Sequence, residues 1–272
     1  MNKGNIFKTF FALLVSFAFF NVSVNAEENS NALTESEEQY LSDVLNLSQV
    51  EISNIPVEEA KFLVENEAEV VTNFNEFYDM EESTSKGGFT TFATIPNSDL
   101  SFSGAILKIN STITNYDAFY AYANFRWLKK PLFALTDKVT IGFPSSLGVY
   151  LPASSGKIKG FSSSYSLYNT STGGSTAISS STTPSDWDPS GGVAGAYNLR
   201  TTLNKNQTHA GRISQTFYVK TSASGKATVK FEYGHKKVKG SVGISVFPSA
   251  GLSISPTQSN IDIKSYAASF SY

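Results

Sequence analysis

The pattern of apolar and polar positions changes near residue 83, from helical spacing to strand-like alternation. Residues 27–82 carry apolar side chains three and four positions apart, as on one face of a helix. In two places a Ser or Thr is followed three positions later by Glu, the capping box that begins a helix: Thr34 with Glu37, and Ser48 with Glu51. Pro56 suits the first turn of a longer helix whose apolar positions include Val71 and Phe77. This segment is therefore predicted to be helical.

From residue 88 onward, short runs rich in Ile, Val, Phe, Tyr and Thr alternate with clusters of Gly, Pro, Asn and Ser. The runs predict about ten strands, at residues 89–94, 100–114, 119–127, 138–143, 147–151, 158–169, 212–220, 226–233, 240–247 and 260–272. Ser224-Gly225 predicts a hairpin turn, and the Ser- and Thr-rich stretches 170–175 and 181–192 predict surface loops. The expected fold is mainly β: an antiparallel β-sandwich or barrel-like domain preceded by a short acidic α-helical segment.

The first 26 residues have the features of a secretory signal peptide. Lys3 and Lys8 precede an apolar run at 10–20, and cleavage is expected after Ala26. The predicted organisation is then an acidic helical segment at 27–82, a polar linker at 83–87 and a basic β-domain at 88–272. The protein is expected to be secreted and extracellular.

Charge divides the chain at the same place. Residues 27–82 hold sixteen acidic residues and one basic residue, whereas residues 83–272 hold eighteen basic and seven acidic residues. Segments of opposite charge attract each other, so we expect an intramolecular contact between them. The acidic segment would act as a pro-region or shield, with Lys86 in the linker as a processing site.

Basic residues provide the main candidate binding surface. Three groups would form a cationic patch if they met on one side of the domain: Arg126, Trp127, Lys129 and Lys130; Lys157 and Lys159; and Lys236, Lys237 and Lys239. Such a patch suits an anionic cell-envelope polymer or membrane headgroups, and nucleic acid is not expected for an exported protein. The alternative is an ordinary solvated surface of lysines.

Catalytic motifs are scarce. The chain has no Cys and two His, with His209 expected in a loop and His235 expected to be exposed beside two lysines. No metal site, catalytic residue or cofactor is predicted, and a non-enzymatic function is expected. A glycoside hydrolase that uses Asp186, Asp188 or Glu232 is a weaker alternative, because it needs two carboxylates about 5–9.5 Å apart.

Two other functions remain open from the sequence. Residues 160–185 carry no charge, and a Ser- and Thr-rich hairpin of this kind resembles the inserting element of a β-pore-forming toxin. The second open function is that of a structural extracellular or matrix protein whose strands self-associate. The ligand, the oligomeric state and removal of the acidic segment are left open.

Overall fold

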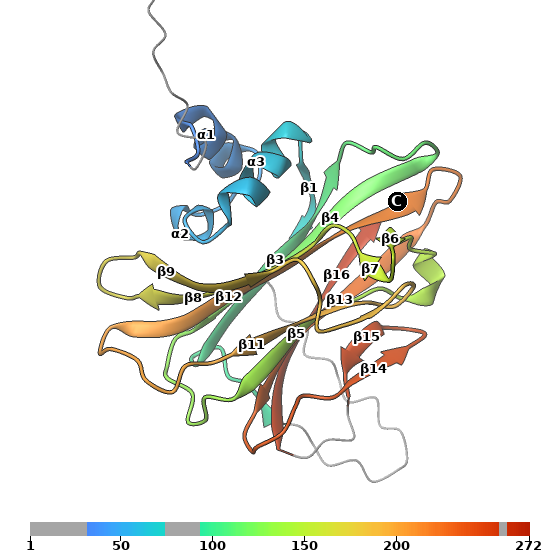
Figure 1. Cartoon of the computed structure of the whole chain (residues 1–272). Coiled ribbons are helices and arrows are strands. Elements are labelled where there is room, and N and C mark those ends of the chain that lie inside the picture. Colours follow the sequence, from blue (N-terminus) through green and yellow to red (C-terminus); the bar gives the residue numbers. More distant parts are fainter. Residues whose placement is uncertain (1–31, 74–92, 256–259) are drawn as a thin grey trace, which may run out of the picture. The chain divides into compact units, whose positions relative to one another are not determined.

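The computed structural model describes residues 32–73, 93–255 and 260–272, which form two six-stranded β-sheets and a group of short helices (Figure 1). The predicted signal peptide, its cleavage after Ala26, the linker and Lys86 lie outside these residues. None of the helices in the described ranges is long and apolar enough to cross a membrane.

Sheet 1 is antiparallel throughout and carries the helices. Its strand order is β1 (Glu69–Asn73), β3 (Leu100–Ile109), β4 (Tyr116–Trp127), β12 (Gln207–Lys220), β8 (Phe161–Asn169) and β9 (Ser175–Ser181). Side chains alternate between an inner face toward the other sheet and an outer face.

Sheet 2 lies against the inner face of sheet 1. Its strand order is β10 (Asp186–Asp188), β11 (Gly192–Asn198), β5 (Thr136–Gly142), β13 (Lys226–Lys236), β16 (Ile261–Ser271) and β2 (Ala93–Thr94), with only β2 parallel to its neighbour. Aromatic side chains of both sheets fill the space between them. Phe217 of sheet 1 stacks on Phe119 at 5.3 Å, and Phe270 of sheet 2 contacts Phe119 edge-on at 5.2 Å. The predicted sandwich preceded by a helical segment is confirmed.

The helices α1 (Glu35–Asp43), α2 (Gln49–Ile52) and α3 (Val57–Glu65) pack on the outer face of sheet 1. Both predicted capping boxes are present, since each Ser or Thr hydroxyl accepts from the backbone of the Glu three positions later. Fully buried leucines of the helices, Leu41 and Leu63, join one apolar cluster with Leu107 and Tyr120 of the sheet. The contact between the acidic segment and the sheet is thus largely apolar.

The third helix is shorter than predicted. It ends at Glu65, Glu67 has a φ of +49°, and β1 then pairs with β3. Val71, predicted to lie in this helix, lies in β1 instead, because β-branched residues favour a strand where an edge is free to pair. Phe77 lies outside the described residues.

Three local predictions were wrong. Ser224-Gly225 joins β12 of sheet 1 to β13 of sheet 2, so it is a connection between sheets rather than a hairpin turn. The run 147–151 contains the end of a 3-10 helix, η1 (Ser145–Leu147), and one isolated bridge from Tyr150 to Tyr218. The predicted loop 181–192 contains the short strand β10.

Two small hairpins complete the described elements: β6 (Ala153–Ser154) with β7 (Lys157–Ile158), and β14 (Ile244–Phe247) with β15 (Gly251–Ile254). The second lies directly on the outer face of sheet 2. A Cβ at Gly142 would come within 2.3 Å of the Ala250 carbonyl oxygen, so only glycine permits this approach. The hairpin therefore covers the middle of sheet 2.

Candidate functional site

The predicted binding residues Arg126 and Trp127 point to opposite faces of β4. The Arg126 guanidinium lies 4.6 Å from the centre of the Tyr168 ring on the outer face. Trp127 is buried in the core, where its Nε1 donates to the Tyr233 hydroxyl at 2.8 Å. Consecutive strand residues alternate in direction, so Trp127 belongs to the sandwich interior and cannot contact a ligand on the outer face.

The other predicted basic residues lie in different places. Lys157 and Lys159 are exposed on and beside β7, where the Lys159 carbonyl accepts from Gln215. Gln215 pairs with Ala121, six residues before Trp127, which places this group roughly 20 Å from the end of β4.

The third group lies at the end of β13. Lys236 is buried, Lys237 forms an ion pair with Asp262 at 2.7 Å, and Lys239 is exposed. The His235 ring contacts the Trp127 ring at 4.9 Å, so the ends of β13 and β4 lie at the same end of the sandwich. The structure therefore brings two of the three predicted groups to one end.

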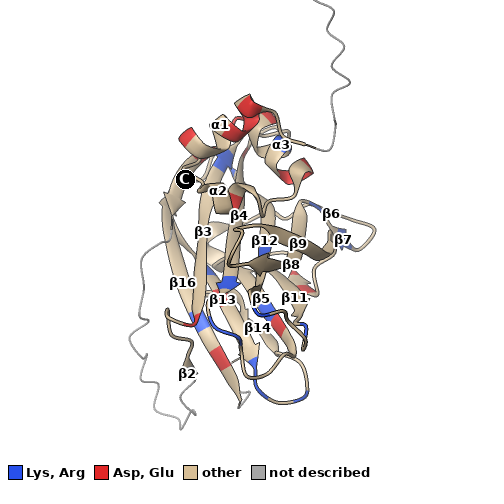
Figure 2. Ribbon diagram, turned by 90° about the vertical axis from the view of Figure 1, so that its left-hand side faces the viewer, with Lys and Arg blue, Asp and Glu red and all other residues tan. Residues whose placement is uncertain are grey.

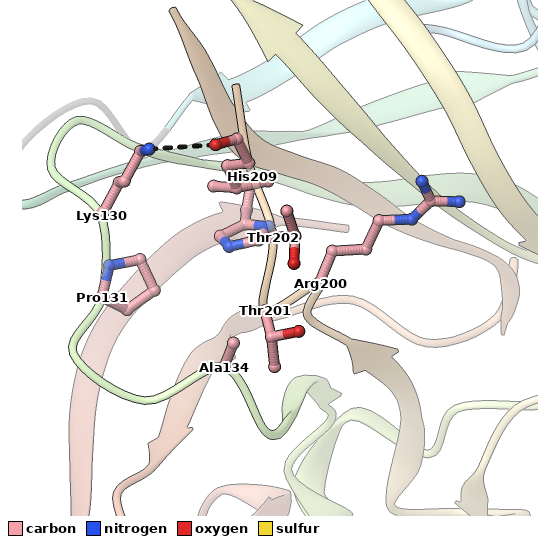
Figure 3. Close-up of a pocket in the computed structure, with 8 residues that line it drawn as sticks. Lys130, Pro131, Ala134, Arg200, Thr201, Thr202 and His209 are labelled. Carbon is pink, nitrogen blue, oxygen red and sulfur yellow. Dashed lines mark hydrogen bonds between the residues drawn. The ribbon is translucent and has the colours of Figure 1, made fainter. Parts of the chain in front are cut away.

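At this end, residues 128–133 form a loop that combines lysines with exposed apolar side chains. Leu132 is 93% exposed, and Leu128 and Phe133 are 46% and 44% exposed. Lys129 forms an ion pair with Asp99 at 2.6 Å, and Lys130 donates to the Leu203 carbonyl oxygen at 3.4 Å (Figure 3). The charge pattern of the sequence indicated the two lysines but gave no signal for Leu132 and Phe133, although all four lie within five consecutive positions.

A cavity of about 240 Å³ adjoins the loop (Figure 3). It is lined by Lys130, Pro131, Ala134, Arg200, Thr201, Thr202, Leu203 and His209. The side chain of Arg200 extends away from Lys130, so the two cations flank the cavity instead of meeting inside it. Lys130 and Arg200 are the charged residues of this lining, so the cavity wall is positively charged.

His209 forms a wall of this cavity and is buried, which corrects its expected place in a loop. It lies in β12, which begins five residues earlier than predicted. Tyr165 accepts from the Arg200 backbone N–H at 3.1 Å, and its hydroxyl lies 2.7 Å from His209 Nδ1. Burial lowers the pKa of His209 to about 4, and the positive charges of His235 and Lys130 act in the same direction. The imidazole is therefore neutral at pH 7 and shares a hydrogen bond with the Tyr165 hydroxyl through Nδ1.

This buried imidazole predicts an acid-sensitive fold. The pKa of His209 is about 4 in the folded protein, whereas a free histidine side chain has a pKa of 6.5. At a pH between these two values the unfolded chain therefore binds more protons than the folded one. Folding stability is therefore expected to fall by about 1–3 kcal/mol as the pH drops from 6.5 to 4. Urea unfolding of the wild type and His209→Asn across this range measures the effect. The difference between the two proteins should change with pH only in this window; a constant difference would contradict it.

A second buried polar group closes the same end of the sandwich. Asp137 is fully buried and accepts from His235 Nδ1 at 2.9 Å, from the Tyr233 hydroxyl and from the Lys236 backbone at 3.2 Å. Burial raises the pKa of Asp137, while these hydrogen bonds, with that from His235 the strongest, oppose the rise. His235 is 4% exposed, so the prediction of an exposed residue was wrong. These hydrogen bonds fix the orientation of the buried side chains at this end. Because His235 and Asp137 are both buried, a substrate cannot reach the pair.

Two of the candidate hydrolase carboxylates, Asp186 and Glu232, are separated by intervening strands. Asp186 of β10 and Glu232 of β13 stand on the same row of sheet 2, with one residue each of β11 and β5 between them. Three strand spacings place them about 14 Å apart, beyond the range of a glycosidase pair. Glu232 is also buried under β15, where it accepts from the Ile254 backbone at 2.7 Å. Asp188 accepts from Ser190 in the turn that follows β10. Asp186 and Glu232 therefore do not form a catalytic pair.

Comparison with known proteins finds no matching family model and no matching curated sequence. Among solved structures, Clostridium perfringens delta-toxin matches 66% of this chain and 87% of its own length, with 7% identity and a TM-score of 0.29. AvmM, which catalyses macrocyclization in alchivemycin A biosynthesis, matches 64% of this chain and 89% of its own, with 12% identity and a TM-score of 0.26. CfaE, the adhesive subunit of the CFA/I fimbria of enterotoxigenic Escherichia coli, matches 66% of this chain and 57% of its own length, with 10% identity and a TM-score of 0.22. Similarity at this level assigns no function.

Proposed function

We propose that this protein is a non-enzymatic extracellular protein that binds anionic membrane surfaces through the loop 128–133. The observation that carries the proposal is Leu132, whose side chain is 93% exposed between two lysines and a half-exposed Phe133. Exposing a large apolar side chain to water gains nothing for the fold. The same side chain contributes binding energy when it enters the boundary between lipid headgroups and acyl chains.

Charge around the loop favours an anionic surface. Lys129, Lys130, Arg200 and Lys205 lie on this loop or on the neighbouring segment, which the Lys130–Leu203 hydrogen bond joins to it. Asp99 offsets one of these charges. Each basic residue near an anionic bilayer contributes about 1 kcal/mol. Lys130, Arg200 and Lys205 form no ion pair with a carboxylate in the described part of the chain, so these three cations and the apolar tip together give useful affinity.

An anionic cell-envelope polymer fits this end less well than a membrane. A hydrated polyanion offers ion pairs to the lysines but no apolar phase for Leu132 and Phe133.

The acidic helices pack on the outer face of sheet 1 through their apolar sides, and the loop follows the far end of β4. The acidic segment therefore has a structural role, and the loop can bind a membrane without removal of this segment.

Replacing the apolar tip tests the proposal. We expect Leu132→Ser/Phe133→Ser to bind phosphatidylglycerol-containing vesicles at least tenfold more weakly, because each buried apolar side chain contributes about 1.5–3 kcal/mol. We expect Lys129→Gln/Lys130→Gln to weaken binding about fivefold or more and to flatten its salt dependence. Vesicle co-sedimentation from 50 to 500 mM salt measures both.

The matched control is Val246→Ser, which removes an exposed apolar side chain from the β14–β15 hairpin. It should bind as the wild type does, and pure phosphatidylcholine vesicles should bind all variants weakly. Equal binding by the wild type and the double serine variant would contradict the proposal, as would no binding of wild type to anionic vesicles.

Membrane insertion as a β-toxin is the second candidate, favoured by the uncharged hairpin of β8 and β9 at the edge of sheet 1. Phe161, Tyr165 and Leu167 of β8 are buried in the core, so insertion requires this strand to leave the sandwich. Release of a dye from anionic vesicles distinguishes pore formation from surface binding, which leaves the vesicles sealed.

A further inference from the structure

The outer face of sheet 1 is divided between an apolar half and a polar half. The helices cover the apolar half, which includes Leu107, Tyr120 and Tyr122. Beyond Tyr122, the outward-facing side chains of β3, β4, β12 and β8 become polar. They border a groove of about 350 Å³. Its polar lining consists of Ser101, Ser103, Asn124, Arg126, Arg212, Ser164 and Ser166 on the sheet, with Ser48, Glu51 and Asn54 on and beside α2.

Two buried donors of this lining have no hydrogen-bond partner within the described residues. Arg212 is 2% exposed; its Nε donates to Glu59 Oε1 at 2.5 Å and its Nη1 to Asn124 Oδ1 at 2.9 Å. The Arg212 Nη2 and the Asn124 Nδ2 groups remain unpaired. Because a buried donor without a partner is costly, an acceptor placed in the groove beside these two adjacent side chains would be stabilised.

The charges argue against an anion as that acceptor. Glu59 already compensates Arg212, and Glu51 places a carboxylate in the groove that balances Arg126, the other cation of the described lining. A peptide also fits poorly. Peptides add to a sheet at its edge, whereas this groove lies across the face of strands that are already paired, and its lining offers few apolar pockets.

We infer that this groove binds a sugar unit of a neutral oligosaccharide, with Arg212 and Asn124 donating to adjacent sugar hydroxyls and Glu51 accepting from one. Sugar hydroxyls both donate and accept, and serine hydroxyls and amides provide matching partners at close spacing. Glu51 Oε1 already faces the groove and lies 3.4 Å from the Ser103 hydroxyl. The site is separate from the loop 128–133, so it stands whether or not the loop binds membranes.

Asn124→Asp tests this assignment. The carboxylate has nearly the same shape as the amide and still accepts from Arg212 Nη1, so the fold should be retained, but the Nδ2 donor is lost. We expect binding of the wild type to at least one of maltotriose, cellotriose and chitotriose below about 10 mM, and about tenfold weaker binding to Asn124→Asp. Ligand-observed NMR titration measures both.

A blocking pair of variants provides an independent readout. Ser166→Tyr fills the groove and should abolish binding, whereas Ser269→Tyr on the exposed outer face of sheet 2 should leave it unchanged. The inference is overturned if none of the three trisaccharides binds, or if Asn124→Asp binds as well as the wild type. It is also overturned if trigalacturonate or an extended peptide binds in their place.

Discussion

Deletion of residues 33–68 is expected to leave a chain that does not fold into a soluble monomer. The helices cover the outer face of sheet 1, and their loss would expose a contiguous apolar surface made of Ala105, Leu107, Ile109, Ala118, Tyr120 and Tyr122. It would also remove Glu59, the carboxylate that pairs with Arg212 beside the Tyr122 ring. Exposed apolar patches of this kind promote aggregation.

Size-exclusion chromatography and thermal unfolding test this expectation, with a chain that begins at Leu33 as the control. That control retains every described helix and should behave as the full chain does. A finer test is Leu63→Ala, which removes a fully buried side chain and should lower the free energy of unfolding by about 2–5 kcal/mol. A monomeric deletion variant with an unchanged melting temperature would contradict the integral role of the helices.

Glu59→Ala is expected to destabilise the contact between helices and sheet strongly. Glu59 on α3 pairs with Arg212 on β12 at 2.5 Å, and the Arg212 guanidinium lies 4.0 Å from the Tyr122 ring centre. Burial alone would lower the pKa of Arg212, but Glu59 raises it above the ordinary value, so the arginine stays charged. Removing the carboxylate leaves a buried charge uncompensated, at a cost of about 3–5 kcal/mol.

Urea unfolding at pH 7 measures this cost. Glu58→Ala is the matched control, because Glu58 is the exposed neighbour on the same helix and should change stability by less than about 0.5 kcal/mol. Combining Glu59→Leu with Arg212→Met should recover most of the loss, since replacing both charges removes the desolvation cost. A loss below about 1 kcal/mol for Glu59→Ala would show that the pair contributes little.

Local sequence signals predicted the elements well, because they depend on neighbouring residues. The two capping boxes begin α1 and α2 where expected, and alternation located most long strands. Which strands pair with each other could not be predicted from such local signals. Ser224-Gly225 has the composition of a hairpin turn, yet the strands on either side pair in different sheets.

The candidate sites were harder to predict because their members are far apart in the chain. Lys130 and His209 border one cavity, and Asn124 and Arg212 share one hydrogen bond across two strands. Net charge also says nothing about which face of a helix makes a contact. The acidic helices were expected to approach a basic surface, but they bury leucines against the sheet and direct most carboxylates to solvent.

The separation of charge along the sheets gives the molecule an electric dipole. Asp and Glu gather on the helices, while the strands and the loops at the opposite end carry Lys and Arg together with a smaller number of acidic residues (Figure 2). Glu59 of α3 contacts the Tyr120 hydroxyl, which lies roughly 23 Å along β4 from the start of the loop after Trp127, although Glu51 of α2 lies nearer to the loop. The larger separation exceeds the screening length of about 10 Å at 0.1 M salt. A negatively charged surface would therefore attract one end and repel the other independently. The resulting torque turns the protein loop-first as it approaches, so that more encounters are productive when the salt concentration is low.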